Sequence, residues 1–527
     1  MKRSLALATA GALLFAAPAW ADREHSTNNT SKKLRQAVTV EGIMEHQQAF
    51  QDIATITGGN RLSGTPGFDA SADYVADKAA AAGLEVSRFD FEYEVDVLAD
   101  YEAPVLDVVS GGPERSFIAG MGGTQLGSEF GSMLFSPPGD VTAPVWAADL
   151  DFDPATAATN TSGCTASDYD GMPDGAIVIL QWDTNCGLGT KFFTAQDQGA
   201  SAIVFFDVEG PFWINVTGTS IPSVEATAAA AEALAGGVEQ GDTGVTARLK
   251  VDFRPGTYPT QNVIAETTDG DPDSVIVVGA HLDSVGVGPG INDNGSGSSA
   301  ILEIAEQIRK VKPRSTIRFM WFGAEEHGLL GSQAYVDSLS DEERGRIKAM
   351  LNFDMIGSPN FVRFVYDGDL SDSEPPEGGA PAASAEIEQL FLDYFAGEGL
   401  ETEPTAFDGR SDYGPFIFAG IPAGGLFTGA EGIKTEEQAE IYGGVAGEQY
   451  DPCYHFSCDD IDNLSLTALD QMSDAAAHAT ITLAQTKDLF ASTPSAPITT
   501  GGGAGSSGGH DHGVLEAPHT LGEAEGL

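Results

Sequence analysis

The sequence predicts an α/β fold, a three-layer sandwich with a mostly parallel central sheet, into which a β-rich domain is inserted. Residues 273–284, "DSVIVVGAHLDS", form a β-branched apolar run typical of a strand buried on both faces of a parallel sheet. A helical pattern follows and ends by Pro313. "STIRFMWFGAEE" and "AMLNFDMIG" are two further buried strands. This alternation of strands and helices favours parallel pairing.

The composition changes along the chain and predicts the domain boundaries. Residues 22–130 hold a helical stretch, "TPGFDASADYVADKAAAAGLEV", and a strand, "SRFDFEYEVDV", and we assign them to the first part of the α/β domain. Residues 131–254 hold short apolar runs among Gly, Pro and Thr, which predicts the inserted β-rich domain. Residues 255–490 complete the α/β domain, and the Gly/Ser-rich residues 491–527 are a flexible tail.

The charge of the chain excludes two classes of partner. Its 527 residues carry 26 Lys and Arg against 78 Asp and Glu, a formal charge of −52. Nucleic-acid binding requires basic side chains that displace counterions, and anionic membrane surfaces attract basic segments. We therefore expect neither partner and no insertion into a membrane. We also expect a monomer whose acidic surface keeps it in solution.

The N-terminus predicts export. Lys2 and Arg3 precede the apolar "LALATAGALLFAAPA", and Ala19-Trp20-Ala21 is a small-x-small cleavage site, so residues 1–21 are interpreted as a cleaved signal peptide. The mature protein is then secreted or periplasmic.

Four cysteines in an oxidising compartment favour disulfides. The near pairs are Cys164–Cys186 and Cys453–Cys458, although four cysteines allow three connectivities and a Cys/His zinc site is the competing interpretation. The second pair would clamp the loop "YHFS".

Acidic and imidazole side chains follow the predicted parallel strands. His281, Glu325, Glu326 and Asp354 each stand where a strand ends, and Asp293 lies in the Gly-rich turn between two of them. Ligands of such sheets gather beyond the carboxyl ends of the strands, so these side chains should meet. Adjacent buried carboxylates repel each other and raise each other's pKa.

A pair of divalent cations removes that repulsion. Imidazole together with carboxylate favours zinc, whereas an all-oxygen set favours magnesium or calcium. The second nitrogen ligand is supplied by His455 in "DPCYHFSC". Calcium in acidic loops such as "CDDIDN" is an alternative without a supporting ligand pattern, since carboxylates in so acidic a chain are usually solvated.

These motifs resemble those of the secreted co-catalytic zinc aminopeptidases of the leucyl aminopeptidase type. The resemblance runs in order through "GAHLDSV", "GINDNGSGSSAILE", "WFGAEEHGLLGS", "NFDMIG", "GRSDYGPF", "IPAGGLFTG" and "DPCYHFSCDD". "NRLSGTPGFDASADYV" resembles the opening of the same catalytic domain. The segment 131–254 resembles a protease-associated (PA) domain through "GAIVIL", "GASAIVFFD" and "IPSV".

The resemblance implies a zinc exopeptidase fold with two zinc ions per chain and a set of five metal ligands. His281 and Asp354 would bind one zinc, Glu326 and His455 the other, and Asp293 would bridge them.

The resemblance also implies roles for residues that do not bind metal. Glu325 would be the general base, Tyr454 would donate a hydrogen bond to the oxyanion, and Asp283 would orient the His281 imidazole. Arg410 and Asp412 in "GRSDYGPF" flank the expected substrate pocket, with a buried salt bridge between them as the other interpretation.

The implied function is that of a metallo-aminopeptidase, a hydrolase that removes the N-terminal residue, preferably a large apolar one, from peptides through a metal-activated water. A zinc carboxypeptidase and a single-zinc glutaminyl cyclase on the same fold are the alternatives. A carboxypeptidase would need basic side chains for the substrate's carboxylate, and this chain has few near the motifs. A non-catalytic binding protein is the alternative from another class, and the complete ligand set argues against it.

Overall fold

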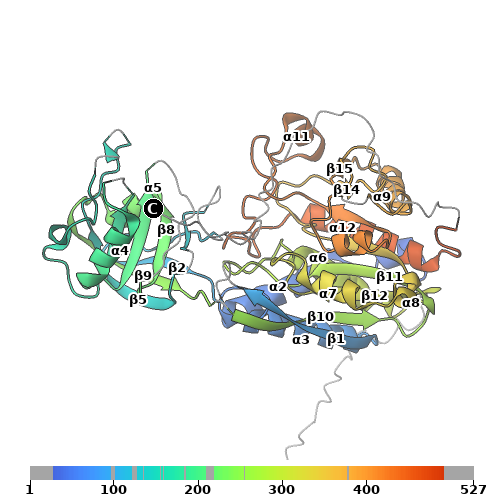
Figure 1. Ribbon diagram of the computed structural model, residues 1–527. Helices are drawn as coiled ribbons and strands as arrows, with labels where there is room; N and C mark the ends of the chain where they lie inside the picture. Colours follow the sequence, from blue (N-terminus) through green and yellow to red (C-terminus); the bar gives the residue numbers. More distant parts are fainter. Residues whose placement is uncertain are drawn as a thin grey trace, which may run out of the picture.

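The chain forms two sheets, each with its own helices (Figure 1). The computed structural model describes residues 28–95, 101–120, 128–133, 136–154, 156–157, 160–182, 185–208, 219–254, 256–376 and 379–491. The predicted signal peptide and the predicted tail beyond residue 491 lie outside these ranges, so both stay predictions.

The first sheet contains the strands predicted from the apolar runs. Its order is β1 (Glu85–Val95), β10 (Gly256–Glu266), β12 (Ser315–Phe322), β11 (Asp271–His281), β13 (Ile347–Phe353), β16 (Ala423–Phe427), β14 (Phe364–Tyr366), β15 (Glu403–Thr405). The central strands β12, β11, β13 and β16 are parallel to their neighbours in this group, and antiparallel pairs lie toward the edges. The predicted mostly parallel central sheet is therefore confirmed.

Strand β11 shows why the sheet is the middle layer of a sandwich. Ile276 and Val278 belong to one hydrophobic cluster, whereas Val275 and Val277 belong to another on the opposite face. Successive side chains of a strand point to opposite faces, so a strand in the middle layer is apolar throughout.

Helices cover both faces of this sheet. The first cluster joins the sheet to α2, α3, α6, α9 and α12, and the second joins it to α7 and α10. The helices of this domain are α1 (Ser31–Arg35), α2 (Val40–Thr57), α3 (Pro66–Ala81), α6 (Gly295–Ile308), α7 (Leu330–Ser338), α8 (Asp341–Arg346), α9 (Ser384–Glu398), α10 (Tyr413–Phe418), α11 (Glu436–Tyr442) and α12 (Leu466–Gln485).

The second sheet belongs to the insert, which leaves and re-enters the first sheet at one place. Val95 at the end of β1 pairs with Gly256 at the start of β10. Between them the chain forms β3 (Arg115–Ser116), β2 (Val105–Ser110), β9 (Gly241–Val251), β5 (Gly139–Ala147), β6 (Ile177–Gln181), β7 (Ala202–Asp207), β8 (Ser223–Thr227) and β4 (Phe130–Ser132), with α4 (Leu188–Asp197), α5 (Ala228–Ala235) and a short 3₁₀ helix, η2 (Ala166–Tyr169). Strand β2 precedes residue 131 and pairs with β9 of the second sheet. The predicted start of the insert at residue 131 therefore falls inside the part of the chain that forms this sheet.

Two disulfides join the near cysteine pairs, Cys164–Cys186 in the insert and Cys453–Cys458 in the loop before α12. The competing Cys/His zinc site is thereby excluded for these cysteines. Within the described ranges, no helix combines the length and the hydrophobicity that a membrane span requires.

The close approach of β13 and β16 gives a test of the sheet. A Cβ atom on Gly425 would lie 1.9 Å from the carbonyl oxygen of Asn352 on the neighbouring strand. We therefore expect Gly425→Ala to destabilise the protein by about 1–3 kcal/mol or more, as overpacking of a core does, measured by chemical unfolding.

Gly345→Ala is the matched control, because Gly345 is exposed in α8 and a Cβ there meets nothing within 4 Å. It should leave stability unchanged or raise it by roughly 0.5–1 kcal/mol. Equal effects of the two substitutions would contradict the described pairing of β13 with β16.

Candidate metal centre

The candidate site lies at the carboxyl edge of the parallel strands. His281 is the last residue of β11, Glu325 and Glu326 follow β12, and Asp354 follows β13. Asp293 lies just before α6, with a cis peptide bond to Asn294. Because parallel strands end at the same edge, positions far apart in sequence come together there.

Asp293 lies between two imidazoles. Its Oδ1 atom is 3.2 Å from His281 Nε2, and its Oδ2 atom is 3.2 Å from His455 Nε2. Each imidazole nitrogen also faces a second carboxylate, since His281 Nε2 is 3.3 Å from Asp354 Oδ1 and His455 Nε2 is 3.2 Å from Glu326 Oε2. The five predicted ligands therefore form two clusters that share Asp293.

Glu325 and Ser411 lie next to the cluster of His281 and Asp354. Glu325 Oε2 is 3.9 Å from His281 Nε2, farther than the carboxylates of Asp293 and Asp354. Ser411 Oγ donates a hydrogen bond of 2.6 Å to Asp354 Oδ2 and accepts one of 2.8 Å from Asn352. Asp354 therefore keeps Oδ1 for the cluster, while Oδ2 is fixed by the hydroxyl.

The donor geometry fits divalent cations. One nitrogen carries at most one proton, yet each Nε2 atom faces two or more carboxylate oxygens. The Glu326 Oε1 atom is buried without a hydrogen-bond partner among the described residues. Lone pairs that converge on one point are satisfied by a cation better than by a single proton, and a set of imidazoles and carboxylates suits zinc.

The titration behaviour of these groups points the same way. Burial, with a further contribution from the neighbouring Asp293, raises the pKa of Glu326 to about 7. Burial opposes protonation of His455, but Glu326 and Asp293 nevertheless raise its pKa to about 10. Metal binding displaces protons from such ligands, so these groups hold protons at neutral pH that a cation would release.

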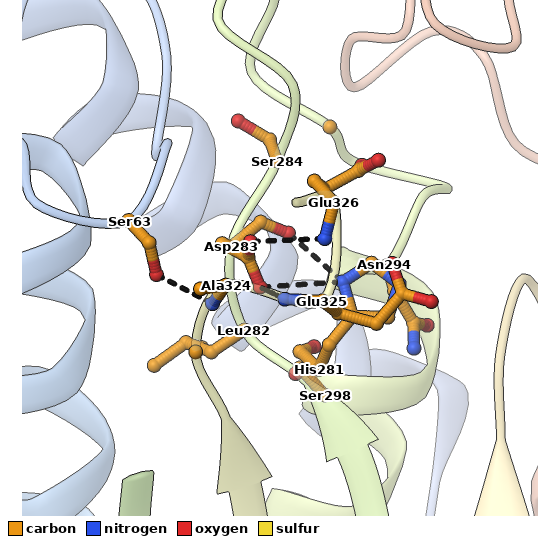
Figure 2. Close-up of polar contacts among 12 residues, drawn as sticks. Ser63, His281, Leu282, Asp283, Ser284, Asn294, Ser298, Ala324, Glu325 and Glu326 are labelled. Atoms are coloured by element: carbon orange, nitrogen blue, oxygen red, sulfur yellow. Dashed lines mark hydrogen bonds and ion pairs between the residues drawn. The ribbon is translucent and has the colours of Figure 1, made fainter. Parts of the chain in front are cut away.

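Asp283 lies beside His281 and the two glutamates (Figure 2). Its carboxylate accepts hydrogen bonds from the backbone N–H groups of Glu325 and Glu326, at 3.3 and 3.4 Å. The His281 Nδ1 atom is 3.1 Å from the Asp283 carbonyl oxygen and 3.6 Å from its carboxylate. Asp283 thus contacts both the imidazole that it was predicted to orient and the backbone of the two glutamates.

Tyr454 and His455 lie in the disulfide loop, and their rings stack at 3.8 Å between centroids. Burial holds the pKa of the Tyr454 hydroxyl well above its usual value, with Asp293 adding to the shift. The phenol therefore stays protonated at neutral pH and keeps a hydrogen to donate.

Arg410 and Asp412 do not form the salt bridge that was one of their two interpretations. The Arg410 side chain is exposed, whereas Asp412 is fully buried at the start of α10. Burial raises the pKa of Asp412 to about 7 against the opposing effect of His281. A contact of either residue with substrate stays a prediction.

Arg61 is a residue of this site that sequence reasoning missed. Its guanidinium is fully buried and donates to three backbone carbonyl oxygens of the segment between His281 and Asp293, those of Leu282, Pro289 (2.8 Å) and Gly290 (2.6 Å). The motif "NRLSGTPGF" signalled a domain opening but not this contact, because backbone carbonyls leave no trace in side-chain spacing.

Asp459 is a second missed residue. Its carboxylate accepts hydrogen bonds from the backbone N–H groups of Asn292 and Asp293, at 2.8 and 2.9 Å. It belongs to the stretch "CDDIDN" that was considered for calcium, and its oxygens instead face the turn that carries Asp293.

Comparisons with known proteins are consistent with this geometry. The sequence model described as Peptidase family M28 matches residues 262–480, and the PA domain model matches residues 141–234. A protein of Pseudomonas aeruginosa named "Aminopeptidase" is 42% identical over 465 residues, which cover 86% of this chain and 82% of the relative. The chain belongs to peptidase family M28.

Other relatives of this peptidase have similar names. "Leucine aminopeptidase 2" of Arthroderma otae is 43% identical over 368 residues, which cover 69% of the peptidase and 71% of the relative. The solved structure of BSAP, a zinc aminopeptidase from Bacillus subtilis, superposes with a TM-score of 0.50 at 23% identity, covering 86% of the peptidase and 96% of that chain. This last likeness supports the fold, and the predicted family and PA-type insert are confirmed by the sequence matches.

The buried guanidinium gives a test of the site's framework. Arg61→Lys keeps the positive charge but cannot donate to three carbonyl oxygens in a fixed fork, and each buried acceptor left unpaired costs about 1–3 kcal/mol. We expect a large drop in the unfolding midpoint together with weaker zinc retention during dialysis.

Arg88→Lys is the control, because Arg88 is a partly exposed residue that pairs with exposed Asp73. Its effect should be within about 0.5 kcal/mol, as for most surface substitutions. If Arg61→Lys behaved like Arg88→Lys, the guanidinium would not hold the segment in place.

Proposed function

We propose that this peptidase is a zinc-dependent aminopeptidase that holds two zinc ions and removes N-terminal residues, preferably large apolar ones, from peptides. The observation that carries the proposal is the Asp293 carboxylate, whose two oxygens each lie 3.2 Å from a different imidazole. Membership of family M28 and relatives named aminopeptidase and leucine aminopeptidase support the reaction class and the substrate preference.

The ligand assignment follows from the two clusters. His281 and Asp354 would hold one ion, His455 and Glu326 the other, and Asp293 would contact both. When bound, zinc supplies Lewis acidity, which favours deprotonation of water and polarises a peptide carbonyl group.

The remaining chemistry belongs to side chains of the protein. Glu325 lies beside the His281 cluster without being among its nearest carboxylates, so it is placed to accept a proton from water and return it to the leaving amine. The Tyr454 phenol, held protonated by burial, is placed to donate a hydrogen bond to the oxyanion. Asp283 would position both glutamates and His281 through the contacts described above.

Recognition of a free N-terminus follows from the charge of the site. A substrate ammonium group would be held by carboxylates, and the candidates are Glu325 and Asp354, which lie beside His281. A carboxypeptidase would need a cation for the terminal carboxylate. The guanidinium of Arg61 donates to three carbonyl oxygens and Arg410 is exposed, so neither is a buried cation free to pair with a carboxylate. This arrangement favours the aminopeptidase over the carboxypeptidase.

The predicted location outside the cytoplasm is supported by the two disulfides, which persist in oxidising compartments. Secretion or periplasmic residence remains a proposal that depends on the predicted signal peptide, and the predicted monomer is likewise untested.

Hydrolysis of leucine p-nitroanilide tests the reaction directly. The purified protein with zinc should release nitroaniline from the free substrate and none from its N-acetylated form, because acetylation removes the ammonium group. Cleavage of C-terminal residues from N-blocked peptides would favour the carboxypeptidase, and cyclisation of N-terminal glutamine would favour the glutaminyl cyclase.

Glu325→Gln tests the general base. The substitution keeps size and hydrogen bonding but cannot accept a proton, so kcat should fall by about 10²–10⁴-fold while zinc content stays at that of the wild type. Exposed Glu342→Gln is the control and should change neither quantity. Turnover by Glu325→Gln near the wild-type rate would refute the assignment.

His455→Ala tests the second zinc position. Removal of this imidazole should lower the zinc content measured by elemental analysis from two ions per chain to about one. His478→Ala is the control, since His478 bonds to Ser31 on the helical side of the fold, and it should retain two ions. An unchanged zinc stoichiometry in His455→Ala would remove it from the ligand set.

A further inference from the structure

The insert contacts the loop that carries Tyr454 and His455. Gly120 of the insert forms an antiparallel bridge with Phe456, the residue after His455. The Ala119 N–H donates to Ser457 Oγ at 3.1 Å, and the Ser457 N–H donates to the Ala119 carbonyl oxygen at 3.0 Å. Phe456 itself is 2% exposed. The loop thus adds a short strand-like segment to the insert.

The insert also packs on the segment between His281 and Asp293. Val285 and Val287 of that segment belong to the hydrophobic core of the insert, together with Phe117 and Phe253. The two active-site segments touch each other as well, because a Cβ on Gly288 would lie 2.6 Å from the Phe456 carbonyl oxygen. We call this three-part contact, residues 117–120, 285–288 and 456–457, the seam.

The backbone near His455 shows what the seam contributes. His455 has a positive φ of 61°, which a non-glycine side chain adopts only when surrounding structure imposes it. The Phe456 N–H donates to the Cys453 carbonyl oxygen and so stays within the loop. The next N–H, that of Ser457, donates to Ala119 of the insert. It is the first N–H after His455 that bonds outside the loop. The disulfide closes the loop, and the insert fixes its position.

We propose that the insert is a positioning element of the catalytic centre, which acts through Ala119–Gly120 on the loop of Tyr454 and His455. This inference rests on the proposed function for those two residues. The alternative role for the insert is that of a module that recruits long substrates. Because an error of about 1 Å in catalytic geometry can cost 10²-fold in rate, a loosened seam should lower kcat rather than raise KM.

Ser457→Ala tests the proposal in the full-length, zinc-loaded protein. The substitution removes the hydroxyl that accepts the hydrogen bond of the Ala119 N–H, and Ala119 is only 1% exposed. The bond from the Ser457 N–H to the Ala119 carbonyl oxygen stays in place. Steady-state kinetics are measured on leucine p-nitroanilide and on a ten-residue peptide with N-terminal leucine, and zinc release to a colorimetric chelator is timed. We expect kcat to fall by roughly tenfold on both substrates with KM unchanged, and zinc release to accelerate.

Ser201→Ala is the matched control, because the Ser201 hydroxyl bonds to the Gly175 carbonyl inside the insert, away from the seam. It should leave both kinetic parameters and zinc release at wild-type values. Gly120→Ala is a second seam variant, since its Cβ would lie 2.5 Å from Ser128 Cβ and force segment 117–120 to shift. Gly112→Ala in the same insert has no contact closer than 3.6 Å and is its control.

Each outcome decides between specific alternatives. A raised KM confined to the long peptide would show that the insert recruits substrate and would overturn the proposal. Identical behaviour of Ser457→Ala and Ser201→Ala, with Gly120→Ala matching Gly112→Ala, would also overturn it. If the wild-type protein fails to cleave leucine p-nitroanilide, the proposed function fails, while zinc release by the variants still tests the seam.

Discussion

One carboxylate shared by two imidazoles is the interaction on which the site depends. Asp293 contributes one oxygen to His281 and the other to His455, so a small displacement of Asp293 would disturb both clusters. Its backbone N–H is fixed by Asp459, and the segment before it is fixed by Arg61. A buried guanidinium and a buried acidic side chain thus hold Asp293 in place through backbone hydrogen bonds.

The architecture brings these charges together from five separate stretches of chain. Parallel strands deliver His281, the glutamate pair and Asp354 to one edge, and the turn into α6 adds Asp293. His455 comes from a loop far from the sheet in sequence, and this loop is held by a disulfide on one side and by the insert on the other. Strand ends and the turn into α6 therefore build the His281 cluster, whereas the second cluster also depends on the contacts that hold the loop of His455.

Much of this was predictable because buried parallel strands have a strong sequence pattern. The run Val275–Val278 is apolar on both faces, and the polar residues that end each strand stand out against it. Contacts to backbone atoms were not predictable, since the carbonyl groups that Arg61 binds and the Ala119–Ser457 pairing depend on chain geometry rather than residue type. Arg410 is exposed and Asp412 is buried although one residue separates them, because local spacing does not determine which side chain faces the interior.

The most direct test of the account is a crystal structure of the zinc-loaded protein with anomalous data collected at the zinc edge. The account predicts two anomalous peaks flanking the Asp293 carboxylate, one beside Nε2 of His281 and the other beside Nε2 of His455. A single peak, or two peaks of which neither contacts Asp293, in crystals of active protein would contradict it.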